Sequence, residues 1–466
     1  MKNNILVIVA DQLAWKALPA YGNQYAETPN IDKIFEEGMS FDSCYSVCPL
    51  CQPSRSAFWS SKYCHEIDVR SNGRKWPITP VGEEVPTLGE TFKNAGYDTV
   101  CFGKDHSAGA LRGFQMIPSE AAKREPDSPG LPLNHDSLTD ITTGRNVVEY
   151  LKQYDGSQPF LAVAGFSNPH NICGWVGAFA GTKENPWLTE NLPPLPENFR
   201  VEDMESRPKA VQYICCSHTR QAQTGEWTDY KFRQYLYAYY YYLGLLDQEV
   251  GHILDALEQS KAAENTMIVF LADHGDSVAA RQRVTKHLDL YDEVIRVPFA
   301  FSGPGVAPRE MPVKGLTSLL DLFPTLCSMA GVEAPEGLRG VDLSGIVKGT
   351  QETPDREYVV SQWQSEYGYT VSPGRMIRND RYKYMRYLEN DDRELYDMVK
   401  DPLEMHNCIE DPDYAEARQE MEALFEKYVA ETADDFEAQP VLVNPKYRSH
   451  TPGYCFHRGP AAPEES

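Results

Sequence analysis

The chain has 466 residues, with 44 Lys and Arg against 68 Asp and Glu, so its formal net charge is −24. This length exceeds one ordinary core and predicts a large domain with a smaller one beside it. Hydrophobic residues make up 41% of the chain, which excludes a disordered protein. The acidic excess argues against nucleic acid or an anionic membrane as the partner, because both would be repelled.

The length of the first apolar run and the number of cysteines indicate the cellular compartment of the protein. The run Ile5 to Ala10 is too short for a secretory signal, and no segment reaches membrane-spanning length. The 11 Cys are an odd number at irregular spacings, which favours reduced thiols over a disulfide framework. We therefore expect a cytoplasmic protein.

Short apolar runs alternate with helical patterns over most of the chain. The runs are Ile5 to Ala10, Thr99 to Phe102, Phe160 to Phe166, Thr266 to Ala272 and Val297 to Phe301. The clearest helical pattern extends from about Lys231 to Ser260 and leads into the fourth run. This alternation predicts an α/β fold, with a large, mostly parallel sheet flanked by helices.

The pattern changes after about Gly340. Short alternating strands are predicted within Ser361 to Tyr387 and at Glu394 to Met398, and an amphipathic helix at Tyr414 to Thr432. We therefore predict a catalytic domain at 1–350 and a smaller C-terminal α+β subdomain with a short antiparallel sheet at 351–466.

Polar residues follow four of the apolar runs. They are Asp11-Gln12, Gly103-Lys104-Asp105-His106, His170 and Asp273-His274. Ligands in open α/β sheets bind beyond the carboxyl ends of the strands, so these four termini can converge on one site.

Asp11, Gln12, Asp273 and His274 are candidate metal ligands. A set dominated by oxygen atoms suits Ca²⁺ or Mg²⁺ better than structural zinc. For either pair alone, the alternative is an acidic residue that caps the next helix.

The segment Cys48-Pro49-Leu50-Cys51-Gln52-Pro53-Ser54-Arg55 is the second feature. A Cys at a helix start lies where free backbone N–H groups favour an anion, either a thiolate or a bound oxyanion. Arg55, one turn along, can neutralise such an anion. The alternatives are a buried, inert Cys51 and a redox Cys-x-x-Cys pair, although no thioredoxin-like pattern follows.

The residues Cys51-Gln52-Pro53-Ser54-Arg55 resemble the Cys-x-Pro-Ser-Arg motif of type I sulfatases, the formylglycine-dependent members of the alkaline phosphatase superfamily. Further segments are similar to that family in the same order: Pro86 to Glu90, Gly96 to Thr99, Gly103 to His106, Tyr239 to Leu257, Ala272 to Asp276, Tyr291 to Pro298, Arg378 to Tyr384, Glu394 to Asp397 and Asp401-Pro402. The resemblance thus covers nearly the whole chain.

The resemblance implies a role for each matching residue. A maturation enzyme would oxidise Cys51 to formylglycine, whose hydrated aldehyde would be the nucleophile. The cation would be held by the formylglycine oxygen together with Asp11, Gln12, Asp273 and His274. The sulfate would be surrounded by Arg55, Lys104 and Lys286. His106 would handle the formylglycine proton, and His170 would protonate the departing alcohol.

The chain departs from the family pattern in two places. Gln12 stands where many relatives have a second Asp, and Ser60-Ser61-Lys62 stands where Thr-Gly-Arg is usual. His287 lies beside Lys286, and the spacing allows either side chain to reach the sulfate.

Substrate-binding residues are less well defined by the sequence. His65, Arg70, Asn72 and Arg74 follow the predicted nucleophile helix, and we assign Asn72, Arg74 and His287 to substrate binding. The irregular segment from Asn171 to Thr228 has the length of a lid or binding element. It holds aromatic side chains suited either to stacking on a ring or to the core: Trp175, Trp187, His218 and Trp227.

Together these features predict hydrolysis of a sulfate monoester, with a sulfated carbohydrate as substrate. The expected partners are this small saccharide and the maturation enzyme, with no nucleic acid or membrane. The alternatives are a phosphonate or phosphate ester hydrolase with the same cation and nucleophile, and a non-catalytic binder of sulfated glycans whose thiol at position 51 is never modified.

Overall fold

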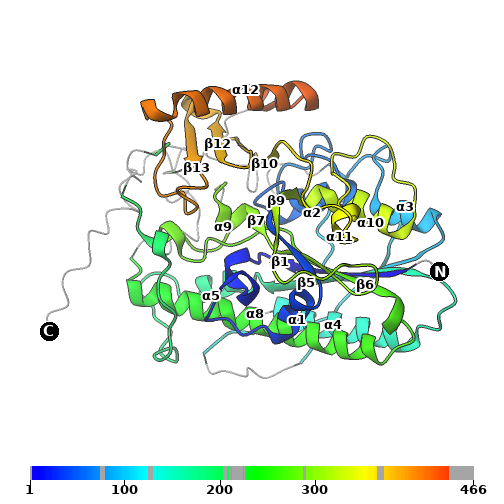
Figure 1. Cartoon of the computed structure of the whole chain (residues 1–466). Helices are drawn as coiled ribbons and strands as arrows, with labels where there is room; N and C mark the ends of the chain where they lie inside the picture. Colours follow the sequence, from blue (N-terminus) through cyan, green and yellow to red (C-terminus); the bar gives the residue numbers. More distant parts are fainter. Residues whose placement is uncertain are drawn as a thin grey trace.

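The computed structural model in Figure 1 describes residues 3–73, 79–123, 130–133, 135–202, 207–208, 211, 224, 226–286, 290–364 and 372–439. The described residues form a nine-stranded sheet flanked by helices and a separate four-stranded sheet. Among them, no helix has the length and apolar character needed to cross a membrane.

The large sheet has the strand order β4-β3-β5-β1-β6-β8-β2-β7, and β9 pairs with β2. Its strands are β1 (Asn4–Asp11), β2 (Met39–Tyr45), β3 (Asp98–Gly103), β4 (Gln115–Ile117), β5 (Phe160–Pro169), β6 (Thr266–Ala272), β7 (Arg296–Val297), β8 (Phe299–Ser302) and β9 (Val313–Ser318). Strands β4, β3, β5, β1 and β6 are all parallel, so their carboxyl ends meet at one edge. The predicted, mostly parallel sheet is confirmed.

Helices cover both faces of this sheet, which explains why its central strands are continuous apolar runs. In Figure 1, one face carries α1 (Pro29–Glu36), α4 (His135–Gln153), α5 (Ile172–Ala178) and α8 (Asp229–Glu258); the other carries α2 (Cys51–Ser60), α3 (Leu88–Asn94), α10 (Leu322–Ala330) and α11 (Ser344–Val347). All eight residues of β1 are buried. The long predicted helix corresponds to α8.

The predicted strand Val297 to Phe301 is divided in the structure. Pro298 separates β7 from β8, because proline has no N–H to donate to a ladder. β7 pairs with β2 at Cys44 and Tyr45, whereas β8 pairs with it at Met39 and Ser40. Both pairings are antiparallel, as is the pairing of β8 with β6.

The C-terminal part forms an antiparallel sheet covered by one helix. The strands are β10 (Val359–Trp363), β11 (Gly374–Arg378), β12 (Tyr382–Tyr387) and β13 (Arg393–Asp397), and the helix is α12 (Ala415–Thr432). The short helix α9 (Asp292–Ile295) precedes β7. Tyr45 and Leu290 share an apolar cluster with Met376 and Tyr396, so the two parts of the chain are packed together. A boundary at residue 350 stays a prediction.

Candidate active site

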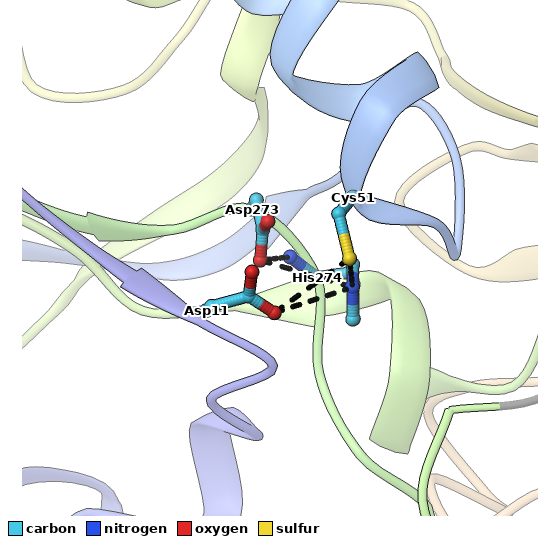
Figure 2. Close-up of side chains that lie close together, drawn as sticks. All are labelled: Asp11, Cys51, Asp273 and His274. Carbon is cyan, nitrogen blue, oxygen red and sulfur yellow. Dashed lines mark hydrogen bonds and ion pairs between the residues drawn. The ribbon is translucent and has the colours of Figure 1, made fainter. Parts of the chain in front are cut away.

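Side chains from three segments meet at the carboxyl edge of the large sheet. Asp11 is the last residue of β1, Asp273 and His274 follow β6, and Cys51 is the first residue of α2. Their ligand atoms all lie within 4.8 Å of one another, and all four residues are buried. Figure 2 shows these side chains pointing toward a common centre. The structure thus brings together four of the five residues predicted to hold the cation.

The start of α2 is fixed against the end of β6. Leu50 is extended and Cys51 begins the helix, every residue of which is buried. The hydroxyl groups of Ser46 and Ser54 each donate a hydrogen bond of 2.6 Å to the carbonyl oxygen of Asp273. These bonds place the side chain at position 51 beside the predicted metal ligands.

The sulfur of Cys51 lies among charged and polar groups. It is 2.8 Å from the Nζ atom of Lys286, 3.2 Å from the Nε2 atom of His274 and 3.7 Å from an oxygen of Asp11. Burial and Asp11 raise the pKa of this thiol, but Lys286, His274 and Lys104 outweigh them and hold it well below its usual value. The site therefore favours an anionic group at position 51.

Basic side chains neutralise the two carboxylates of the cluster. Arg55 donates from Nε to Asp273 over 2.7 Å, and Lys104 forms an ion pair with Asp11. Burial alone would raise the pKa of Asp11, yet Lys104, His170 and other cations hold it well below its usual range. Asp11 is therefore charged at neutral pH and able to ligate a cation.

His274 is oriented by a neighbouring backbone carbonyl. Its Nδ1 atom lies 2.8 Å from the carbonyl oxygen of Gly275, which can only accept a hydrogen bond. This contact places a proton on Nδ1 and directs Nε2 toward the cluster. The ring is thus oriented so that Nε2, once deprotonated, can ligate a cation.

Gln12 contributes to the site through its backbone and is turned toward a further carboxylate. Its backbone N–H donates to Asp273 over 3.1 Å, and its side-chain Nε2 donates to Asp276 over 2.7 Å. Its amide also lies 3.6 Å from the sulfur of Cys173. The predicted ligation of a cation by Gln12 stays a prediction.

The two histidines assigned to proton transfer follow neighbouring strands. His106 lies two residues after Lys104, is partly buried and has a φ of 49°. His170 follows β5, and its backbone N–H donates to the carbonyl oxygen of Ser167 over 3.0 Å. The charge of His170 lowers the pKa of Asp11, so this ring lies close enough to interact with the predicted metal ligands.

Only one of the three predicted substrate-binding residues lies in the described part of the chain. Asn72 accepts a hydrogen bond of 3.1 Å from the backbone N–H of Gln52, next to the nucleophile position. Arg74 and His287 lie outside the described residues. His65 and Arg70 contact the C-terminal subdomain instead, at the carbonyl oxygen of Thr432 and the carboxylate of Asp435, respectively.

The aromatic residues of the irregular segment have different positions. Trp175 and Trp227 are buried and pack edge to face, with ring centroids 5.8 Å apart. Trp187 is 65% exposed. His218 lies outside the described residues. The structure therefore places Trp175 and Trp227 in the core and leaves Trp187 on the surface.

Sequence reasoning did not single out the buried network beside Gln12. Tyr235 and Tyr239, one turn apart on α8, have hydroxyl groups that reach Asp276 and the carbonyl oxygen of Gln12, respectively. Both lie within the helical pattern predicted from about Lys231 to Ser260, which assigns no function to either tyrosine. Their spacing of four residues places both tyrosines on one face of the predicted helix, and this spacing was the available signal.

Comparison with known proteins agrees with this geometry. A family model described as "Sulfatase" matches residues 3–332, and one described as "N-sulphoglucosamine sulphohydrolase, C-terminal" matches residues 285–431. A Δ4,5-hexuronate-2-O-sulfatase of Bacteroides thetaiotaomicron is 42% identical over 465 residues, which cover 99% of this chain and 96% of that protein. A choline-sulfatase of Rhizobium meliloti is 28% identical, with 88% and 83% covered.

Solved structures show the same relationship. The structure of a 2-O GAG sulfatase superimposes with a TM-score of 0.94 at 43% identity, and 99% of each chain is covered. A phosphonate monoester hydrolase of Agrobacterium radiobacter, at a TM-score of 0.74 and 20% identity, covers 94% of this chain and 97% of its own and shares the fold. The sulfatase model spans more than half of the chain, and its match includes every residue of the buried cluster, so this chain belongs to the sulfatase family of sulfuric ester hydrolases.

Proposed function

We propose that this chain uses formylglycine at position 51 and a bound Ca²⁺ ion to remove the 2-O-sulfate from an unsaturated hexuronate of a sulfated glycosaminoglycan. The observation that carries the proposal is the buried cluster of Asp11, Cys51, Asp273 and His274 with Lys286 on the sulfur. The cluster supports the chemistry, and the 42% identity to a Δ4,5-hexuronate-2-O-sulfatase supports the substrate.

The donor set of the cluster fits a hard divalent cation. Asp11 and Asp273 supply carboxylate oxygens, His274 supplies Nε2, and Gln12 and the oxygen of formylglycine would complete the set. Calcium accepts more oxygen ligands than magnesium and in less regular geometry, so we prefer Ca²⁺ over Mg²⁺ here. The bound cation would lower the pKa of the nucleophile and offset negative charge on the sulfate.

Conversion of Cys51 to formylglycine, by a maturation enzyme acting as a partner, would supply a hydrated aldehyde as the nucleophile. The surrounding residues would then act on the substrate itself. Arg55, Lys104 and Lys286 would bind the sulfate oxygens, whose charge they stabilise in the transition state. His170 would give a proton to the departing sugar oxygen, and His106 would exchange a proton with the hydroxyl group at position 51.

The local charge of the site suits a substrate with two anionic groups. The chain as a whole carries a net charge of −24, so an anionic saccharide is repelled at long range. At the site itself, the cations that surround position 51 attract an anionic group instead of repelling it, as the lowered pKa of Cys51 indicates. A 2-O-sulfated hexuronate, with a sulfate and a carboxylate on one ring, would benefit from such a local excess of positive charge.

We also propose that the protein is located in the cytoplasm. The described part of the chain has eight cysteines, and all eight are free thiols, which supports a reducing, cytoplasmic location. Fractionation of cells that express the chain tests this, because activity in the periplasmic or extracellular fraction would contradict it.

The function is tested with matched saccharides. The matured protein should release sulfate from a 2-O-sulfated Δ4,5-unsaturated disaccharide and should act much more slowly on the same disaccharide sulfated at the 6-O or N position. Mass spectrometry of the peptide containing residue 51 should show formylglycine. Cys51→Ala should abolish turnover, whereas Cys327→Ala, a buried thiol in α10, should retain it. Faster cleavage of phosphonate or phosphate esters, or binding without turnover, would overturn the proposal.

A further inference from the structure

The hydroxyl group of Tyr235 joins two segments that contribute to the site. Tyr235 lies on α8 and is fully buried. Its oxygen accepts a hydrogen bond of 2.8 Å from the backbone N–H of Thr285 and donates to a carboxylate oxygen of Asp276. Burial and the charge of Asp276 raise the pKa of this phenol well above its usual value, so it stays protonated and able to donate.

The segment between Asp276 and Thr285 has an unusual backbone conformation. Within it, five residues other than glycine adopt positive φ angles: Val278 at 38°, Ala279 at 66°, Arg281 at 54°, Gln282 at 57° and Thr285 at 62°. Residues that carry a Cβ atom rarely adopt positive φ angles, and the β-branched residues Val and Thr are the most disfavoured there. Such a conformation persists only where surrounding contacts hold it, and strain of this kind clusters at functional sites.

Contacts at both ends hold the segment, and Arg281 anchors its middle to Glu293 and to the carbonyl oxygen of Leu403. Ser277 donates to the carbonyl oxygen of Thr285 from its backbone N–H over 3.0 Å and from its hydroxyl group over 2.8 Å. The N–H of Val278 donates to Asp276 over 2.8 Å. Tyr235 is bonded to Asp276 at the first end and to Thr285 at the second, so one hydroxyl group on a rigid helix fixes both.

The second end of the segment leads directly to the site. Lys286 follows Thr285, is buried, and places its Nζ atom 2.8 Å from the sulfur of Cys51. At the first end, the other oxygen of Asp276 accepts the side-chain hydrogen bond of Gln12. A shift of the second end would therefore move the Lys286 ammonium group, whereas Gln12 is bonded to the oxygen of Asp276 that Tyr235 does not contact.

We propose that Tyr235 is a positioning residue: its hydroxyl group holds the strained segment 277–285 in the conformation that delivers Lys286 to position 51. This inference rests on the proposed role of Lys286 at the sulfate. Tyr235 does not touch the substrate, and its effect on catalysis passes through Lys286. Removing the hydroxyl group therefore acts only while the lysine is present.

The experiment compares two tyrosines of the same helix. Tyr235→Phe keeps the ring and its packing against Trp175 and Trp227 and removes only the hydroxyl group. The control is Tyr242→Phe, which likewise removes one buried hydroxyl group, here bonded over 2.8 Å to the carbonyl oxygen of Pro132. We expect Tyr235→Phe to lower kcat/KM for sulfate ester hydrolysis by about 10- to 100-fold, and Tyr242→Phe by about twofold or less.

A double-mutant cycle separates positioning from a general structural effect. In the Lys286→Ala background, Tyr235→Phe should lower kcat/KM by no more than about twofold, because its target is gone. Affinity for inorganic sulfate, measured calorimetrically, should fall in Tyr235→Phe and fall further in Lys286→Ala, and the double variant should equal Lys286→Ala. Thermal unfolding of each variant shows that it is folded at the assay temperature.

Three results would overturn the inference. The first is Tyr235→Phe activity equal to that of Tyr242→Phe, and the second is a Tyr235→Phe loss that persists in the Lys286→Ala background. The third is a Lys286→Ala variant with unchanged activity and sulfate affinity. If the matured wild-type protein cleaves no sulfate ester, the proposed function is wrong, and the sulfate-affinity cycle then decides the role of Tyr235 by itself.

Discussion

The ammonium nitrogen of Lys286 lies 2.8 Å from the sulfur of Cys51, although 235 positions separate the two residues along the chain. Arg55 and Lys104 each form an ion pair with a carboxylate of the cluster, whereas Lys286 contacts the nucleophile position directly. In the proposed mechanism, this difference makes Lys286 the cation best placed to stabilise charge that develops between the nucleophile and the sulfate.

Replacing Lys286 by Ala should therefore lower kcat/KM by about 10²- to 10³-fold, the usual cost of losing one preorganised charge-stabilising donor. Lys314→Ala, which removes an exposed lysine of β9, is the matched control and should change kcat/KM by about twofold or less. Steady-state kinetics on the matured protein measure both. Equal activity of the two variants would show that Lys286 does not act on the reaction.

Removing divalent cations should abolish turnover, because the buried ligand atoms of Asp11, Asp273 and His274 beside position 51 would lose the ion that is proposed to activate the nucleophile and the sulfate. After treatment with a chelator, Ca²⁺ should restore activity and raise the unfolding temperature, since a ligand that binds only the folded state stabilises it. Asp273→Asn should weaken both effects. Full activity in the presence of excess chelator would contradict the assignment, and recovery with Mg²⁺ alone would contradict the choice of calcium.

The convergence of Asp11 and Asp273 could be predicted from the sequence because it depends on a simple property of parallel strands. Both residues follow apolar runs that read as buried strands, and β1 and β6 are adjacent and parallel in the structure. The N-terminal position of Cys51 on a helix also followed from the residues around it. Strand β2, by contrast, has no apolar run and was not predicted.

The hydrogen bonds of Tyr235 to Asp276 and Thr285 could not be predicted, because they depend on backbone geometry that the residue types do not signal. The segment 277–285 adopts positive φ angles without any glycine at those positions. Helical periodicity identifies Tyr235 as a buried residue, but the partners of its hydroxyl group are set by this segment. For the same reason, the sequence left open whether Lys286 or His287 reaches the sulfate.

His170→Ala should reveal the proton donor through its dependence on the leaving group. A sugar alkoxide needs protonation as it departs, whereas a nitrophenolate does not, so the variant should lose about 10²- to 10⁴-fold on the saccharide and much less on 4-nitrophenyl sulfate. His106→Ala is the comparison, because its proposed proton transfer occurs at position 51 and should slow both substrates alike. Equal losses of His170→Ala on the two substrates would contradict its assignment.

Asp434 should make folding stability depend on pH through its bidentate pair with Arg375, whose Nε and Nη2 donate over 2.7 and 2.9 Å. Burial raises the pKa of this carboxyl, but Arg375 outweighs burial and holds it well below its usual value in the folded chain. The unfolded state therefore takes up the proton first, so the stabilisation is present above about pH 4 and is lost as the pH falls further.

Asp434→Asn leaves a buried guanidinium without its counter-charge and should lower the free energy of unfolding at pH 7 by about 3–5 kcal/mol. Urea unfolding should show this gap between wild type and variant narrowing toward pH 3.5, while the exposed Asp413→Asn follows the wild type at every pH. A gap that stayed constant over this range would show that the carboxylate charge does not stabilise the fold.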